Sequence, residues 1–97
     1  MEALILAELV PDRATEILAR GRVFGESRMI CGAHTRSAVE AGWLAGSVAN
    51  AALHGSPAFR TDLDAARDEM ALVRANAPAP DAAACRVEAA ALLRGDF

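Results

Sequence analysis

Breakers divide this chain into short segments, and each segment has the periodicity of a helix. The breakers lie at residues 10–12, at Gly32, at residues 55–57 and at residues 76–80, where proline or glycine ends one helix or opens the next. Between them apolar side chains recur every three to four positions, and nowhere do they alternate with polar ones as in a strand. The sequence therefore predicts an all-α fold, a helical bundle of about five helices.

The expected helices cover residues 1–9, 11–30, 35–53, 57–74 and 81–93. The first begins without an N-cap residue, whereas Ser56 and Asp81 are typical N-caps for the last two. Gly32 and Gly95 are expected to end the second and the last helix. We divide the chain into a helical domain over residues 1–75, a stiff Pro/Ala linker over 76–80 and a C-terminal helix over 81–97.

Small residues dominate the third expected helix, including a Gly-x-x-x-Gly pair at Gly42 and Gly46. We expect it to be the tightly packed central helix of a soluble bundle. A membrane span is disfavoured, because the apolar run is only about 16 residues and a span needs about 20. The run also contains Glu40 and Asn50.

Two further patterns predict helix packing. Gly21 and Gly25 lie four apart in the second helix, so another helix or a ligand can approach on that side. The fourth helix has an apolar stripe that favours a packing seam over a cofactor site: Phe59, Leu63, Ala66, Met70 and Val73. Its expected solvated face consists of Asp62, Asp64, Arg67, Asp68 and Arg74.

Composition excludes some classes of function. Net charge is -3, all ten basic residues are arginine, and the only aromatic residues are three Phe and one Trp. A nucleic-acid binder that relies on bulk charge and base stacking is therefore not expected. Cys31 and Cys85 have no metal-ligand spacing. We interpret them as two buried thiols in preference to a disulfide, and we predict no metal site.

One arginine falls where it needs an anionic partner. Ile17, Gly21, Phe24 and Arg28 follow one another at steps of four, three and four, so they share one stripe of the second helix. Arg28 is therefore expected on the apolar side of that helix, where an unpaired guanidinium is costly. Its planar fork suits a carboxylate or an oxyanion.

His34 follows a helix stop and precedes a helix start, where side chains face clefts and backbone N–H groups are free. A lone histidine is more often structural, but Arg28 six residues earlier raises the case for a site with an oxyanion clamp and a nucleophile or base. His54, beside Gly55, fits a C-terminal capping residue better.

Residues 25–34 resemble the third signature block of the class A bacterial non-specific acid phosphatases. These belong to the phosphatidic-acid-phosphatase superfamily, which includes the vanadium haloperoxidases. The block reads Ser-Arg, five residues, His, three residues, Asp, and Ser27, Arg28 and His34 match it. The resemblance covers roughly residues 2–75, with collinear matches on both sides of the block, and is weak after Pro78.

The resemblance implies part of the helical core of that superfamily and a phosphomonoesterase that works through a phosphohistidine. His34 would attack phosphorus, and Arg28, with Ser27, would hold the phosphate oxygens. No metal or cofactor is implied, although phosphate or vanadate can occupy such a site. The parent family is periplasmic or secreted, whereas this chain shows no signal peptide, so its own compartment stays open.

The chain also departs from the family pattern. Ala38 stands where the Asp that orients the histidine belongs, and Glu40 points about 200° away around a helix. The family's first two blocks, which carry a lysine and a Pro-Ser-Gly-His segment, have no counterpart here. We therefore expect a truncated C-terminal half.

Two hypotheses follow from this reading. The first is an acid phosphatase piece that is inactive alone. The second is a non-catalytic helical module for oligomerisation or partner binding. Because the second and third helices would lack packing partners, we expect exposed apolar faces and a homo-oligomer, with the missing N-terminal half as the other candidate partner.

Overall fold

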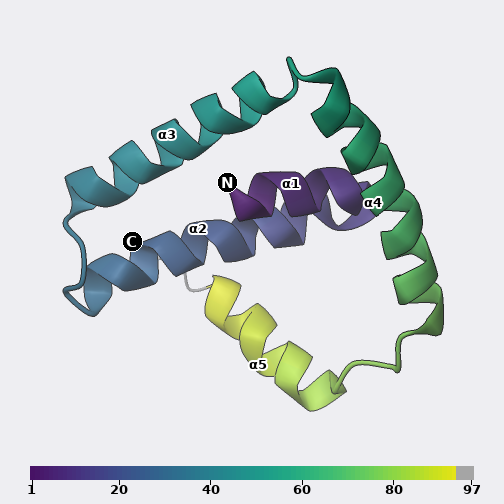
Figure 1. The fold of residues 1–97 in the computed structure, drawn as a ribbon. Coiled ribbons are helices and arrows are strands. Elements are labelled where there is room, and N and C mark those ends of the chain that lie inside the picture. The colour runs from purple at the N-terminus through teal and green to yellow at the C-terminus, as the bar shows by residue number, and fades with distance from the viewer. Residues whose placement is uncertain (94–97) are drawn as a thin grey trace.

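The computed structural model describes residues 1–93, which form helices joined by turns and contain no strand (Figure 1). The helices are α1 (Glu2–Leu9), a 3-10 turn η1 (Pro11–Arg13), α2 (Ala14–Ile30), α3 (Arg36–Leu53), α4 (Pro57–Asn76) and α5 (Ala82–Leu93). The all-α prediction is confirmed. The second expected helix begins with η1 before it becomes α-helical, and α4 continues two residues further than expected. Gly95 lies outside the described residues.

The capping residues explain where the helices begin. Thr35 Oγ1 accepts a hydrogen bond from the Ala38 N–H at 3.2 Å, and Ser56 Oγ accepts one from the Phe59 N–H at 3.3 Å. Asp81 accepts at 2.9 Å from the N–H of Ala83 at the start of α5. The predicted caps at Ser56 and Asp81 are confirmed, and Met1 precedes α1 without a side-chain cap.

Two glycines let α1 and α3 approach α2 closely. A Cβ atom at Gly21 would lie 2.6 Å from Cβ of Ala3 in α1, and one at Gly25 would lie 2.8 Å from Nε1 of Trp43 in α3. The predicted close approach on the glycine side of α2 is therefore confirmed. In Figure 1, α1 and α2 lie side by side at the centre, and α3, α4 and α5 frame them.

The prediction that α3 is the tightly packed central helix is wrong for this chain. Only Val39 of α3 is buried, and Leu44 and Val48 are 68% and 61% exposed. Of its glycine pair, a Cβ added at Gly46 would lie 3.1 Å from the backbone nitrogen of Met1, whereas one added at Gly42 would meet nothing within 4 Å. The helix at the centre is α1, which contacts α2, α3 and α4.

The apolar stripe of α4 packs as predicted over most of its length. Leu63 is buried, Phe59, Ala66 and Met70 are half-buried, and Val73 is exposed. The packing seam is therefore confirmed apart from its last member, and α4 contacts α1.

The predicted solvated face of α4 is correct for its three acidic residues and for Arg74, which are exposed, and wrong for Arg67. Half-buried Arg67 donates from Nε to the carbonyl oxygen of Glu8 at 3.1 Å. Arg74 donates twice to the carboxylate of Asp12, at 2.9 Å each. Both arginines connect α4 to the N-terminal part of the chain.

The molecule is thin and open. Its Cα extents are 38 × 36 × 18 Å, and its radius of gyration is 15.5 Å, against about 13 Å for a compact chain of this length. Its accessible surface is 7042 Å², whereas a folded protein of this mass exposes about 5,300 Å². Among residues 1–93 the buried apolar residues are Ala7, Val10, Val39 and Leu63. The predicted exposure of apolar faces on α2 and α3 is confirmed, for example at Phe24, Ile30 and Leu44.

The C-terminal helix packs on α2 through an ion pair of 2.7 Å between Arg20 and Glu88. The division into residues 1–75, 76–80 and 81–97 stays a prediction. None of the helices within residues 1–93 combines the length and apolar character needed to cross a membrane.

Candidate functional site

Gly32 ends α2 with the backbone geometry that favours glycine. Its φ is 72°, in the left-handed region. Its N–H donates to the Met29 carbonyl at 3.1 Å, and the Ala33 N–H donates to the Arg28 carbonyl at 3.0 Å. This pair of bonds is a Schellman motif, and it satisfies carbonyl groups that the helix end would leave open. The prediction that Gly32 ends the helix is confirmed.

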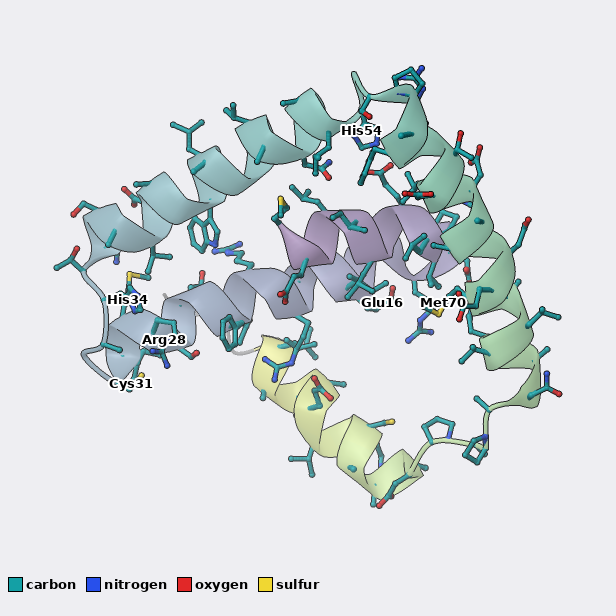
Figure 2. The ribbon with its side chains drawn as sticks, in the orientation of Figure 1. Glu16, Arg28, Cys31, His34, His54 and Met70 are labelled. Carbon is teal, nitrogen blue, oxygen red and sulfur yellow. The ribbon has the colours of Figure 1, made fainter. Side chains whose placement is uncertain are left out.

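The same turn also joins the backbone of His34 to the backbone of Arg28. The His34 N–H donates to the Arg28 carbonyl at 3.1 Å, so that one oxygen accepts two hydrogen bonds. Thr35, the N-cap of α3, follows directly. Figure 2 shows Arg28, Cys31 and His34 gathered at the end of the molecule where α2 passes to α3.

The three residues of the motif have different surroundings. Ser27 is half-buried, and its Oγ donates to the Phe24 carbonyl at 2.6 Å. Arg28 is half-buried, and its guanidinium pairs with no carboxylate among residues 1–93. The His34 side chain is exposed and forms no hydrogen bond within the same residues. The end of α2 and the turn after it therefore hold an arginine and a histidine that are both open to a ligand.

The buried charge of α2 is Glu26, a residue that the spacing argument missed. Glu26 is 3% exposed, and its Oε1 accepts from Arg22 Nε at 2.8 Å. Its Oε2 is buried without a hydrogen-bond partner in the part of the chain described. The stripe through Arg28 is only partly covered, since Phe24 is 62% exposed. The four-residue spacing of Arg22 and Glu26, which makes them neighbours on a helix, was the feature of the sequence that could have identified this ion pair.

At position 38, where the resemblance leads us to expect an aspartate, the chain has an alanine, and no neighbouring carboxylate replaces it. Ala38 is exposed, and its N–H is engaged by Thr35. Glu40 lies 4.0 Å from Arg36 in an exposed ion pair. Within residues 1–93 no carboxylate therefore contacts the His34 ring.

Both cysteines contradict the prediction of buried thiols. Cys31 and Cys85 are exposed, and neither forms a disulfide. Cys31 Sγ donates to the Ser27 carbonyl at 2.9 Å in the last turn of α2. Cys31 lies at a helix end and Cys85 on a peripheral helix, and no further layer from residues 1–93 covers either thiol.

A second polar cluster joins α1, α3 and α4, and the sequence reasoning missed its main contact. His54 Nε2 lies 2.7 Å from Glu8 Oε2, and His54 Nδ1 lies 2.8 Å from the Asn50 carbonyl. Asn50 Nδ2 also donates to Glu8 Oε1 at 3.3 Å. The predicted role of His54 at the C-terminus of α3 is confirmed, since it is the C-cap residue.

Both ring nitrogens of His54 face oxygen acceptors, so only the imidazolium form satisfies them. The Asn50 carbonyl, and next the Glu8 carboxylate, raise the pKa of His54 above its usual 6.5. The hydrogen bond from His54 lowers the pKa of Glu8 below 4.5. The histidine contribution to stability is full below pH 6.5 and is lost as pH rises through its raised pKa. The glutamate contribution is full above pH 4.5 and is lost as pH falls through its lowered pKa.

No group of three or more His, Cys, Asp or Glu side chains within residues 1–93 is arranged to hold a metal ion.

Comparison with curated proteins identifies relatives of one kind. The chain is 51% identical over 89 residues to the acid phosphatase of Zymomonas mobilis, covering 92% of this chain and 34% of that protein. It is 48% identical over 68 residues to the non-specific acid phosphatase of Salmonella typhimurium, covering 70% and 27%. The protein of that name from Providencia stuartii is 43% identical over 72 residues, covering 74% and 29%.

Neither a family model nor a solved structure matches the chain significantly. The relatives nevertheless agree in name, and their matches cover 70–92% of this chain. The chain spans between about a quarter and a third of the length of each relative, 27–34%. By sequence, therefore, it belongs to the acid phosphatase family.

Proposed function

We propose that the turn between α2 and α3 is the phosphate-binding part of an acid phosphatase site that acts on phosphomonoesters. The observation that carries this proposal is the double hydrogen bond to the Arg28 carbonyl, from Ala33 and His34. These hydrogen bonds hold the backbone of His34 against the last turn of α2, which carries Arg28. The similarity to proteins named acid phosphatase supports the choice of phosphate as the anion.

In this proposal Arg28 binds the phosphate oxygens through its planar fork, and Ser27 completes the donor set. Arg28 is free for this role because it pairs with no carboxylate among residues 1–93. Ser27 is bonded to the Phe24 carbonyl and would have to rotate toward the ligand. Phosphate, or vanadate as its analogue, is the expected ligand.

His34 is the proposed nucleophile. A ring nitrogen would form a bond to phosphorus as the bond from phosphorus to the leaving oxygen breaks, and the leaving alkoxide takes a proton. Water would then attack the phosphohistidine, so that phosphate leaves and the imidazole is regenerated. The reaction needs a neutral ring with one nitrogen free, and a carboxylate on the other nitrogen holds that form best. Ala38 cannot supply it, so we expect phosphate binding with little turnover by this chain alone.

Binding and hydrolysis are tested separately. We expect Arg28→Ala and His34→Ala to weaken titrated phosphate or vanadate binding at least tenfold, and Arg86→Ala, on exposed α5, to leave it unchanged. Equal binding by all four proteins, or no binding by any, would overturn the proposal.

Hydrolysis of a chromogenic phosphomonoester is measured at about pH 5 to 7, where histidine changes charge. Ala38→Asp is expected to raise turnover above the wild type, because it restores a carboxylate four residues after His34. Ala38→Asn is the matched control without charge, and His34→Ala sets the background. If Ala38→Asn raised turnover as much as Ala38→Asp, the orienting role of a carboxylate would be wrong.

The alternative function is a non-catalytic helical module for oligomerisation or partner binding, and the exposed apolar residues of α3 favour it.

A further inference from the structure

The C-terminal end of α3 is attached to α1 by polar contacts and has little apolar cover. Within residues 47–53, Asn50 and Leu53 are half-buried and the others are exposed. Asn50 Nδ2 donates to Glu8 Oε1 at 3.3 Å, and His54 Nε2 lies 2.7 Å from Glu8 Oε2. We call Glu8, Asn50 and His54 the polar clasp. Figure 2 shows His54 at one end of α3 and His34 at the other, so the polar clasp is separate from the proposed phosphate site.

The groups that face His54 come from α1, from α3 and from α4. The Glu8 carboxylate of α1 lies against Nε2, and the Asn50 carbonyl of α3 lies 2.8 Å from Nδ1. From α4, Arg60 donates to the His54 carbonyl, and Arg67 donates to the Glu8 carbonyl at 3.1 Å. The Asn50 carbonyl, and next the Glu8 carboxylate, raise the pKa of His54, and the charge of Arg60 opposes them more weakly. The surroundings of the ring therefore favour the imidazolium form.

Loss of the ring proton creates a mismatch that neither tautomer removes. Neutral imidazole has one N–H donor and one nitrogen lone pair. If Nε2 keeps its hydrogen, Nδ1 presents a lone pair to the Asn50 carbonyl, and if Nδ1 keeps it, Nε2 presents a lone pair to Glu8. Because the ring is rigid, a rotation that moves Nδ1 away from the carbonyl also moves Nε2 away from Glu8. The neutral ring therefore weakens the attachment of α3 to α1.

The helix α4 has attachments of its own that do not involve His54. Leu63 is buried, and Arg67 bonds to the backbone of Glu8 and not to its carboxylate. Arg74 donates twice to the carboxylate of Asp12, at 2.9 Å each. These hydrogen bonds lower the pKa of Asp12 and raise the pKa of Arg74, so this pair stays charged while histidine titrates. We therefore expect α4 to stay in place when the polar clasp opens.

We propose that the polar clasp is an acid-closed switch: protonated His54 holds the C-terminal end of α3 on α1, and neutral His54 lets that end separate while α4 stays attached. The clasp is closed below pH 6.5 and opens as pH rises through the raised pKa of His54. Glu8 stays ionised over this range, because the hydrogen bond from His54 lowers its pKa below 4.5. The switch moves one helix end and is therefore distinct from a loss of stability of the whole fold. It is independent of phosphate binding.

Amide hydrogen exchange measured by NMR on the whole chain tests this proposal, at pH values of about 5.5 and 8.5 on either side of the histidine range. Protection factors are compared, since they remove the intrinsic pH dependence of exchange. The amides of Leu53 and His54 report on the end of α3, and those of Val73 and Arg74 report on α4 beside its own tether. From the lower to the higher pH, protection at Leu53 and His54 should fall at least about threefold. Protection at Val73 and Arg74 should stay unchanged.

Two variants separate the clasp from the tether. His54→Gln cannot titrate, so the protection of Leu53 should no longer depend on pH. Asp12→Asn is the matched control, because it weakens the tether to Arg74: it should lower protection at Val73 at both pH values and leave the pH dependence at Leu53 intact. Far-UV circular dichroism verifies that each variant keeps its helices.

Three results would overturn the proposal. The first is a wild type in which protection at Leu53 and His54 does not change between the two pH values. The second is an equal loss of protection at Val73, which would mean that the whole fold loosens and not one helix end. The third is a folded His54→Gln protein in which Leu53 loses protection with pH as it does in the wild type.

Discussion

Replacing Gly21 by alanine tests the close contact between α1 and α2. Alanine in a helix interior is favoured over glycine by about 1 kcal/mol, so a free site would gain stability. At Gly21, however, the new Cβ would lie 2.6 Å from Cβ of Ala3, whereas carbon atoms in contact are about 3.5–4.0 Å apart. The two helices must separate by about 1 Å to admit it.

Overpacking of this kind costs about 1–3 kcal/mol. After the helix-propensity gain, the free energy of unfolding of Gly21→Ala should fall by about 0–2 kcal/mol. Gly42→Ala is the matched control, because it lies inside α3 with nothing within 4 Å of its new Cβ. Its free energy of unfolding should rise by about 1 kcal/mol. The two variants should therefore differ by about 1–3 kcal/mol.

Urea unfolding followed by circular dichroism measures this difference, with all proteins at one fixed concentration because self-association shifts apparent stability. In thermal unfolding, each kcal/mol corresponds to about 4–8 °C for a chain of this size. If Gly21→Ala is stabilised as much as Gly42→Ala, the tight approach of α1 to α2 is wrong.

Two further predictions concern the turn and the polar cluster. Gly32→Ala should lower the free energy of unfolding by about 1–2 kcal/mol, because a φ of 72° is unfavourable for a residue with a side chain. A clash does not contribute, since a Cβ added there would meet nothing within 4 Å. Urea unfolding checks this, and an unchanged midpoint would contradict it. The melting temperature of the wild type should peak between about pH 4.5 and 6.5 and fall as pH rises through the raised pKa of His54. His54→Gln should lose that fall on the alkaline side, and an identical pH profile for both proteins would refute the role of His54.

The sequence predicted features that depend on neighbouring residues. The end of α2 at Gly32 and the start of α4 at Ser56 follow from local backbone and capping chemistry, and both are confirmed. The placement of His34 at a helix junction was predictable for the same reason. The roles of Ser27, Arg28 and His34 toward phosphate stay predictions.

Contacts between distant segments were not predictable from spacing. Glu8 and His54 are 46 residues apart, and Asp12 and Arg74 are 62 apart. Read along the chain, His54 looks like a helix cap and Arg74 like part of a solvated face, so neither residue points to its distant partner. The exposure of Cys31 and of α3 also depends on which layers are present, a property that helical periodicity does not encode.

The hydrogen bond from Arg67 to the Glu8 carbonyl has a consequence for synthesis of the chain. The two residues are 59 positions apart, so α1 leaves the ribosome long before α4 exists to hold it. At about 5–20 residues per second, that interval lasts roughly 3–12 s. During this time α1 and α2 can pair locally through Gly21, but His54 follows Glu8 only after 46 residues and Arg67 only after 59. The helices α1 and α2 are therefore synthesised before any of the contacts that α3 and α4 make with α1, and translation of α4 supplies the hydrogen bond from Arg67 that holds α1.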